Sequence, residues 1–325
     1  MLLISGKMST QHVKVIIPRR FNSSSSSFFG NIGDSLKKVV PKPHQYFQVT
    51  KPLGFNRPPV LFKDIPRKKF FTAENLNFPK RLWNFYFDGI TRRTKVAAIQ
   101  KDLAYGGMYD FHVYMKTKGK LFLSPPSYFK KEKALYFPNF KVKSLTGKNV
   151  EVMKALHKSE ITILRIYSTE SGAEATKNYF NIPNSEDTYL SDSGIDILKQ
   201  SFPHTQIVQM VLSENWSKFF VHKFVSPPKI KAQLPKSQYE NYLIALREKV
   251  LTRDEREKLL MTNVYAGYIF LIDSSYKIRW VGSGLPDQKE VDGLWKAVKG
   301  LEKELTLKSP IKVPLQEKVK IHTEN

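Results

Sequence analysis

The C-terminal part of the chain has the most regular pattern of apolar and polar positions. Residues 266–305 predict a strand, a turn and a second strand, forming a hairpin over 268–280. A glycine break at Gly282-Ser283-Gly284 follows, and then a helix. The predicted apolar face of this helix consists of Val291, Leu294, Trp295, Val298, Leu301 and Leu305. The pattern therefore predicts a β-hairpin followed by an amphipathic helix.

Two nearly continuous apolar runs upstream predict strands buried on both faces. They are Ile161–Tyr167 and Gln206–Leu212. After the first run, Ser168-Thr169-Glu170 has the residue types that begin a helix, here predicted over 172–180. A strand, a helix and a second strand in this order predict a parallel pairing of the two strands.

The residues around these strands predict a hairpin and a helical insertion. The segments Lys141–Leu145 (KVKSL) and Asn149–Met153 (NVEVM) flank the Thr146-Gly147-Lys148 turn and predict the hairpin. Residues 235–261 are predicted to be helical, and Thr252 with Glu255 forms a capping box within them. The apolar stripe of the insertion is Tyr239, Tyr242, Leu243, Leu246 and Val250. We therefore predict an α/β domain over 134–307, a thioredoxin-like mixed sheet flanked by helices with an insertion at 235–261.

The chain contains no cysteine, although a thioredoxin-like domain performs its redox chemistry with thiols. The reactive pair of that fold follows the first buried strand, which corresponds here to 168–171. Ser168 and Ser171 occupy this place, and helix capping is the favoured interpretation of the hydroxyl residues. His157 lies eleven residues before Ser168 and is a weak signal for a base. We therefore predict no catalytic residues and a function in binding.

Metal and nucleotide sites are not indicated either. The seven histidines are scattered without helical pairing, and their default interpretation is structural. Gly282-Ser283-Gly284 lacks the further glycine and the lysine of nucleotide-binding motifs, so its expected role is to let the chain turn. The sequence therefore predicts no metal and no cofactor.

Positive charge is concentrated in the first half of the chain. Residues 1–150 hold 28 Lys and Arg against 7 Asp and Glu, a net charge of +21, whereas residues 151–325 hold 25 against 22. A field of one sign indicates an anionic partner such as lipid headgroups, RNA or an acidic protein. Residues 71–133 are predicted to contain a helix over 80–103 and a hairpin of 109–115 with 121–123.

The ends of the chain and the connector have compositions of their own. Residues 1–33 are basic, rich in serine and free of acidic residues, which is typical of a mitochondrial transit peptide. Residues 34–70 read as a basic, proline-rich connector, and 308–325 as a disordered tail. No run of about 18 apolar residues occurs, so any membrane association is expected to be peripheral.

Several strings resemble a known family. Tyr265–Asp273 (YAGYIFLID) and Lys277–Gly284 (KIRWVGSG), together with Gly119–Phe122 and Tyr136–Asn139, resemble the fungal mitochondrial ATPase-complex assembly factors that act on the Fo sector, the "Atp-ten" family. This resemblance implies a peripheral protein on the matrix side of the inner membrane. It also implies a chaperone that binds newly made subunit a of ATP synthase and promotes its joining to the subunit c ring, without enzymatic activity or cofactor.

Two groups of residues are predicted to contact the partner. The first interleaves cations with aromatics and consists of Arg81, Trp83, Phe85, Tyr86, Arg92 and Arg93. The second is Arg279 with Trp280 on the C-terminal hairpin. The alternative for the second group is a packed tryptophan with its arginine directed outward. An alternative function is that of an RNA-binding or mitoribosome-associated protein using the basic half.

Overall fold

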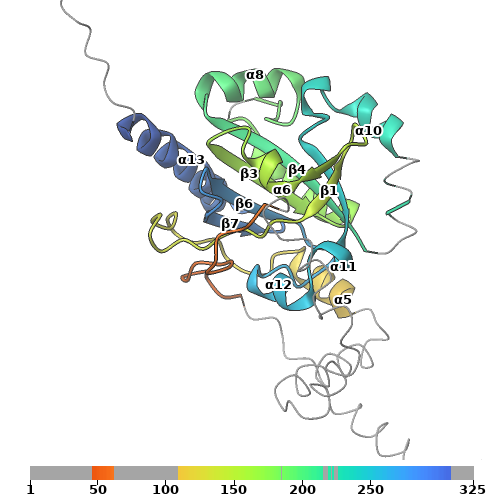
Figure 1. Cartoon of the computed structure of the whole chain (residues 1–325). Coiled ribbons are helices and arrows are strands. Elements are labelled where there is room, and N and C mark those ends of the chain that lie inside the picture. Colours follow the sequence, from red (N-terminus) through yellow and green to blue (C-terminus); the bar gives the residue numbers. More distant parts are fainter. Residues whose placement is uncertain are drawn as a thin grey trace, which may run out of the picture. The chain divides into compact units, whose positions relative to one another are not determined.

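A seven-stranded mixed sheet organises the protein (Figure 1). The structure, a computed structural model, describes residues 46–61, 109–183, 185–214, 219–220, 222 and 226–308. The chain divides into two units, Met1–Pro41 and Lys42–Asn325, and every described residue lies in the second. The predicted transit peptide, the helix over 80–103 and the C-terminal tail lie outside the described residues.

The strand order of the sheet is β2-β1-β5-β4-β3-β6-β7. The strands are β1 (Lys141–Ser144), β2 (Asn149–Glu151), β3 (Ile161–Tyr167), β4 (Thr205–Ser213), β5 (Tyr242–Leu246), β6 (Tyr268–Asp273) and β7 (Ile278–Ser283). β3 pairs in parallel with β4 and antiparallel with β6, and β6 pairs antiparallel with β7. The parallel β3–β4 unit, the β6–β7 hairpin and the final helix confirm the predicted thioredoxin-like α/β arrangement.

Helices and loop segments cover both faces of the sheet. The α-helices are α5 (Tyr109–Thr117), α6 (Val152–Leu156), α7 (Glu170–Lys177), α8 (Asp192–Ser201), α10 (Pro227–Gln233), α11 (Arg247–Val250), α12 (Arg253–Lys258) and α13 (Gln288–Lys308). Two short 3-10 helices are η2 (Asn178–Phe180) and η4 (Lys236–Gln238). No helix in the described part of the chain is both long and apolar enough to cross a membrane.

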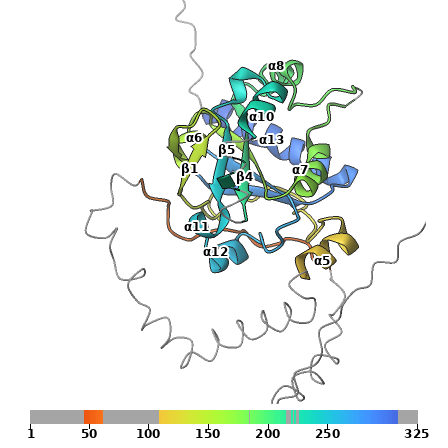
Figure 2. The same cartoon turned by 90° about the vertical axis from the view of Figure 1, so that its right-hand side faces the viewer.

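Helices lie on both faces of the sheet (Figure 2), and each face carries its own apolar core. On one face, side chains of η2, α8 and α13 pack on Ile161 and Ile163 of β3. On the other, α6 and the residues that follow α12 pack on Leu164 and Ile166. Since successive residues of a strand point to opposite faces, β3 contributes to both cores, as its apolar run predicts.

Local signals account for the ends of several elements. Thr252 and Glu255 form the predicted capping box at the start of α12, where each side chain accepts a hydrogen bond from the other residue's backbone N–H. The turn between β1 and β2 places Gly147 at φ +84°, a conformation that favours glycine. The amphipathic α13 buries Leu294, Val298 and Leu301 as predicted. These elements are determined by residues close in sequence.

The predicted helical insertion at 235–261 is wrong in its central part. Residues 242–246 form β5, which pairs in parallel with β4. Four of its five residues are buried, so the run Tyr-Leu-Ile-Ala-Leu is apolar on both faces and has no periodicity that separates a strand from a helix. The backbone groups along the edge of β4 supply hydrogen-bond partners that make the strand favourable.

The predicted hairpin of 109–115 with 121–123 is also wrong. Tyr109–Thr117 is helix α5. The next two residues, Lys118 and Gly119, have positive φ and terminate the helix. Its aromatic and β-branched residues favour strands in general. Here Asp110 fixes the helix from outside, since its carboxylate accepts a hydrogen bond from Val264 N at 3.0 Å and its carbonyl one from Asn263 Nδ2 at 2.7 Å.

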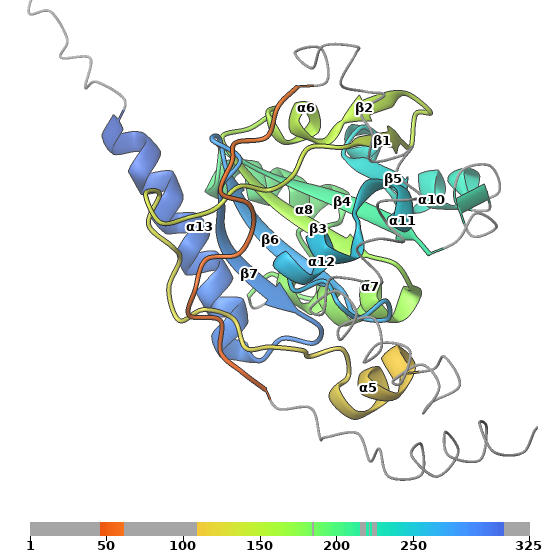
Figure 3. The ribbon, with the colours of Figure 1, turned by 60° about the horizontal axis from the view of Figure 1, so that its bottom comes forward.

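Extended segments complete one face of the sheet. One of them, residues 121–140, is called the strap below. Residues 46–61 run beside it (Figure 3). Backbone hydrogen bonds join Val49 to Leu123 and Phe55 to Tyr136, and Ile278 of β7 donates to Leu135 at 2.8 Å. The strap buries Phe122 and Phe137 in the core, so residues on both sides of the predicted domain boundary at 134 share one core.

A polar joint holds the start of the strap against β7 and α13. Ser283 Oγ accepts from Leu121 N at 3.2 Å, and the buried Glu290 carboxylate accepts from Ser124 N at 2.9 Å and from Lys120. Gly284, at φ +57°, lies so close that a Cβ there would fall 2.1 Å from the carbonyl carbon of Gly119.

Gly284→Ala should therefore destabilise the protein more than Gly147→Ala. Both glycines have positive φ, which costs an alanine about 1 kcal/mol, but nothing lies within 4 Å of a Cβ at Gly147. We expect Gly284→Ala to lower the free energy of unfolding by a further 1–3 kcal/mol, roughly, through overpacking. Urea denaturation of the two variants measures this difference, and equal losses would contradict the close approach of Gly119 to Gly284.

Candidate functional site

The position of the thioredoxin reactive pair lies where β3 ends and α7 begins. Thr169 is the N-cap of α7, since its Oγ1 accepts a hydrogen bond from Gly172 N at 3.3 Å. The hydroxyls of Thr169 and Ser171 each donate to the carbonyl of Tyr265 at 3.3 Å, in the loop before β6. The capping interpretation of this stretch is confirmed for Thr169, and the hydroxyls join α7 to the 263–267 loop.

The chemical capacity of this position is limited. A serine or threonine hydroxyl needs a neighbouring base to become a nucleophile. His157, the base that the sequence suggests, precedes β3, whereas Ser168 follows it, so about 20 Å of strand separates them. The Nδ1 of His157 lies 3.2 Å from the Tyr276 hydroxyl instead. Among the described residues, no group of three His, Asp or Glu is placed to hold a metal ion.

A buried arginine lies behind this position. Arg165 of β3 is 5% exposed, and burial lowers the pKa of its guanidinium. It donates to Thr176 Oγ1 at 3.0 Å, to Gln209 Oε1 at 2.9 Å and to the carbonyl of Ala173. Its guanidinium also lies 5.0 Å from the ring centre of Tyr167. Arg165 therefore joins α7 to β3 and β4, and its polar groups are occupied by this structural role.

The loop of residues 263–267 is held from its other side by Tyr268. The Tyr268 hydroxyl donates to the carbonyl of Asn263 at 2.8 Å and accepts from Asn263 N at 3.0 Å. Burial raises the pKa of Tyr268 well above its ordinary value. Sequence reasoning missed this anchor and Arg165, because both depend on contacts between residues far apart in the chain.

The two predicted partner-binding residues of the hairpin are buried. Trp280 is fully buried in the core with α13, edge-to-face with Tyr179 at 6.1 Å between ring centres. Arg279 is 1% exposed. Neither side chain is therefore exposed to a partner in this fold, and their contact with one stays a prediction. The alternative was right about the packed tryptophan and wrong about an outward arginine.

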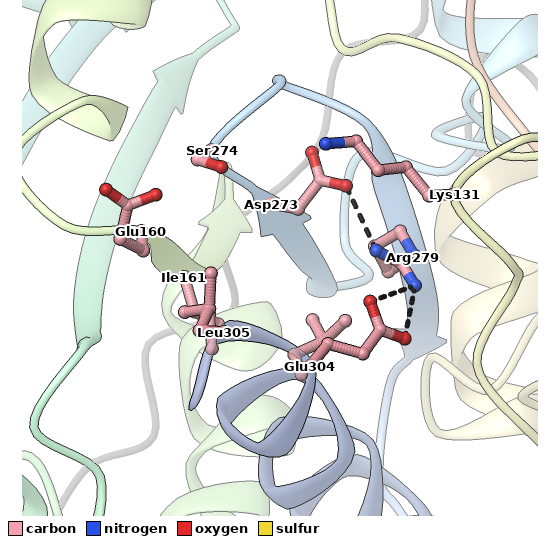
Figure 4. A pocket seen from close by; sticks show the side chains of 9 residues that line it. Lys131, Glu160, Ile161, Asp273, Ser274, Arg279, Glu304 and Leu305 are labelled. Atoms are coloured by element: carbon pink, nitrogen blue, oxygen red, sulfur yellow. Dashed lines mark hydrogen bonds and ion pairs between the residues drawn. The ribbon is translucent and has the colours of Figure 1, made fainter. Parts of the chain in front are cut away.

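Arg279 is buried because carboxylates and a carbonyl surround it (Figure 4). Its Nη1 lies 3.1 Å from Asp273 Oδ2, and its Nη2 lies 3.0 Å from Glu304 Oε1. Nε donates to the carbonyl of Phe129 in the strap at 2.6 Å. The side chain thus joins β6, β7, α13 and the strap. The other predicted contacts, Arg81, Trp83, Phe85, Tyr86, Arg92 and Arg93, lie outside the described residues.

Comparison with known proteins identifies the family. The ATP10 protein family matches residues 34–301. The chain belongs to this family. One ATP10-family relative, "Mitochondrial ATPase complex subunit ATP10" of Candida glabrata, is 31% identical over 282 residues, covering 87% of this chain and 94% of that protein. The Saccharomyces cerevisiae protein of the same name is 30% identical over 266 residues, covering 80% and 89%.

Solved structures with similarity to this ATP10-family chain are more distant. BsSco, a member of the Sco family of cytochrome c oxidase assembly proteins, has a TM-score of 0.35 at 12% identity, covering 52% of this chain and 95% of that one. A DsbF homologue from Corynebacterium diphtheriae has a TM-score of 0.33 at 12% identity, covering 53% and 90%.

The stability of the protein should depend on pH through Tyr268. Tyrosine in an unfolded chain ionises near pH 10, and the folded-state pKa is higher. The contribution is therefore complete below about pH 10 and is lost as the pH rises, by up to about 1.4 kcal/mol per pH unit for this residue. Urea denaturation between neutral and alkaline pH should show a shallower decline in Tyr268→Phe. An unchanged slope would contradict the burial of this hydroxyl.

Arg279→Ala should destabilise the protein strongly. Removing one partner of a buried ion pair leaves the others uncompensated and costs about 3–5 kcal/mol. The matched control is Arg253→Ala, which breaks an exposed i,i+4 pair with Glu257 and should cost less than about 1 kcal/mol. Urea denaturation measures both. If Arg279→Ala were as stable as the parent but failed to bind its partner, the result would contradict this prediction and support a partner contact by Arg279.

Proposed function

We propose that this chain is an assembly factor of the mitochondrial ATP synthase that acts by binding. The observation that carries the proposal is the ATP10 family match over residues 34–301, with relatives named as subunits of the mitochondrial ATPase complex. The absence of cysteine supports binding over redox catalysis, since hydroxyls at 168–171 do not replace thiolates. The hydrogen bonds of Thr169 and Ser171 to the 263–267 loop give these hydroxyls a structural role.

The proposed client is newly made subunit a of the Fo sector, which the chain helps to join to the subunit c ring. This part of the proposal comes from the sequence resemblance. A factor for a membrane-embedded subunit needs affinity for the membrane surface. Without residues 1–33, residues 34–150 hold 24 Lys and Arg against 7 Asp and Glu, and this net charge of +17 suits the anionic lipid of the inner leaflet. We therefore place the protein peripherally on the matrix side of the inner membrane, with residues 1–33 as the transit peptide.

The proposed contact stretch is 81–93, where cations alternate with aromatics. Such a stretch also suits RNA, in which bases stack on aromatic rings and phosphates pair with cations. The two functions differ in their response to nuclease and salt, because counterion release makes RNA binding strongly salt-dependent.

The test is crosslinking and affinity purification from fungal mitochondria in which a tagged copy replaces the native ATP10-family protein. We expect recovery of newly translated subunit a that withstands nuclease. The variant Arg81→Gln/Arg92→Gln/Arg93→Gln should reduce recovery several-fold. The control Lys296→Gln/Lys299→Gln/Lys303→Gln removes the same charge from exposed positions of α13 and should have no effect.

Three outcomes would count against this proposal. Recovery of ribosomal RNA in place of subunit a, lost at high salt, would favour the RNA-binding function. Recovery of subunit a at equal levels with both variants would remove 81–93 from the contact surface. If the tagged parent chain replaced the native protein and assembled ATP synthase were not restored, the assembly role itself would be contradicted.

A further inference from the structure

A groove opens in the sheet where β1 and β5 diverge. These strands pair only at Lys143 with Ile244 and at Ser144 with Leu243. Lys141 and Val142 at the start of β1 pair with β2 but not with β5. Ala245 and Leu246 at the end of β5 pair with β4 but not with β1. The space between has a volume of about 640 Å³, within the range of sites for small organic ligands. Figure 3 shows β1, β2 and β5 at this end of the sheet.

The groove combines a cationic rim with an aliphatic lining. Its cations are Lys141, Lys143, Lys148, Lys154 and Lys249. Its aliphatic residues are Val142, Val150, Ala245, Leu246 and Val250, beside Ile244. One carboxylate, Glu151, belongs to the lining, and it accepts a hydrogen bond from Asn139 Nδ2 at 2.9 Å and pairs with Lys154 at 3.7 Å. The groove therefore has an excess of positive charge next to apolar surface, which suits an amphipathic anion.

We propose that this groove binds one anionic phospholipid of a membrane surface. The phosphate would lie among the lysines, and the adjoining part of an acyl chain would lie on the partly exposed Val150, Leu246 and Val250. Lysine binds phosphate as a compact charge, and the partly exposed Val150, Leu246 and Val250 beside the lysines offer apolar surface that an acyl chain can cover. Among the described residues of the lining, Phe219 is the single aromatic one, whereas sequence-tolerant RNA sites stack successive bases on several rings.

The site deepens the proposed membrane association but does not depend on the client. It would direct the β1–β2 end of the sheet towards the bilayer, in addition to any attraction from the basic N-terminal half. Lys148 forms an ion pair with Glu240 at 3.7 Å. Both side chains are exposed and water screens the pair, so Lys148 can still attract a phosphate.

The experiment uses the full chain and vesicles without any ATP synthase subunit. The vesicles contain phosphatidylcholine alone or phosphatidylcholine with phosphatidylglycerol. Both kinds carry a photoactivatable group at the start of one acyl chain, on phosphatidylcholine in the first kind and on phosphatidylglycerol in the second. We expect crosslinks on the groove peptides that contain Val142, Val150 and Leu246, only with the anionic vesicles. Vesicle flotation should show binding weakened by roughly fivefold for each lysine removed in Lys143→Gln/Lys249→Gln.

The matched control is Lys299→Gln/Lys303→Gln, which removes equal charge from exposed positions of α13. It should keep the groove crosslinks and bind more tightly than the groove variant. A second groove variant, Val250→Asn, should lose acyl-chain crosslinks while keeping its thermal unfolding temperature within a few degrees of the parent.

The proposal is overturned if the crosslinks map only to residues 1–108 or spread over the surface, or if both double variants weaken binding equally. Full displacement by inorganic phosphate, with no acyl-chain crosslink, would show a phosphate site and overturn the lipid assignment. None of these results bears on subunit a, because no client is present, so failure of the lipid site and failure of the assembly role remain distinguishable.

Discussion

The structure depends on the burial of β3 on both faces. This strand pairs in parallel with β4 and antiparallel with β6, and its side chains alternate between the two apolar cores. A central strand of this kind must be covered from both sides. Helices α8 and α13 cover one face, and α6 with the strap covers the other. The end of β3 then sets the place of residues 168–171, beside the loop that precedes β6.

Two buried arginines show how the fold accommodates charge around this core. Arg279 is matched by the carboxylates of Asp273 and Glu304, whereas Arg165 is held by neutral oxygens and lies near aromatic rings. Burial of a cation is tolerated when hydrogen bonds and opposite charge replace its water. Both residues join elements that are distant in sequence. The region around the thioredoxin reactive position is thus a structural joint in this ATP10-family chain.

Positive charge is concentrated in two parts of the chain. The concentration of positive charge in residues 1–150 and the lysine groove between β1 and β5 both suit anionic partners. The membrane association proposed above would draw on this attraction, which does not require catalytic geometry. The hydroxyls of Thr169 and Ser171 are occupied by hydrogen bonds within the fold, whereas the lysines of the groove lie at the β1–β2 edge of the sheet.

The sequence by itself determined the elements whose signals are local. The apolar runs of β3 and β4, the hairpin of β6 and β7, the capping box at Thr252 and the apolar face of α13 are all visible without a structure. Family membership could also be anticipated from short strings such as 277–284. These features depend on periodicity, on turn residues or on side chains within a few positions of one another.

Only the tertiary structure decided the elements and roles that depend on distant partners. Residues 242–246 become a strand because the edge of β4 supplies their hydrogen bonds, and residues 109–117 become a helix whose Asp110 contacts the loop at 263–264. Arg279 lies inside because Asp273, Glu304 and the strap converge on it. A short apolar run or a single arginine has several favourable environments, and the choice among them is made by the groups that folding brings beside it.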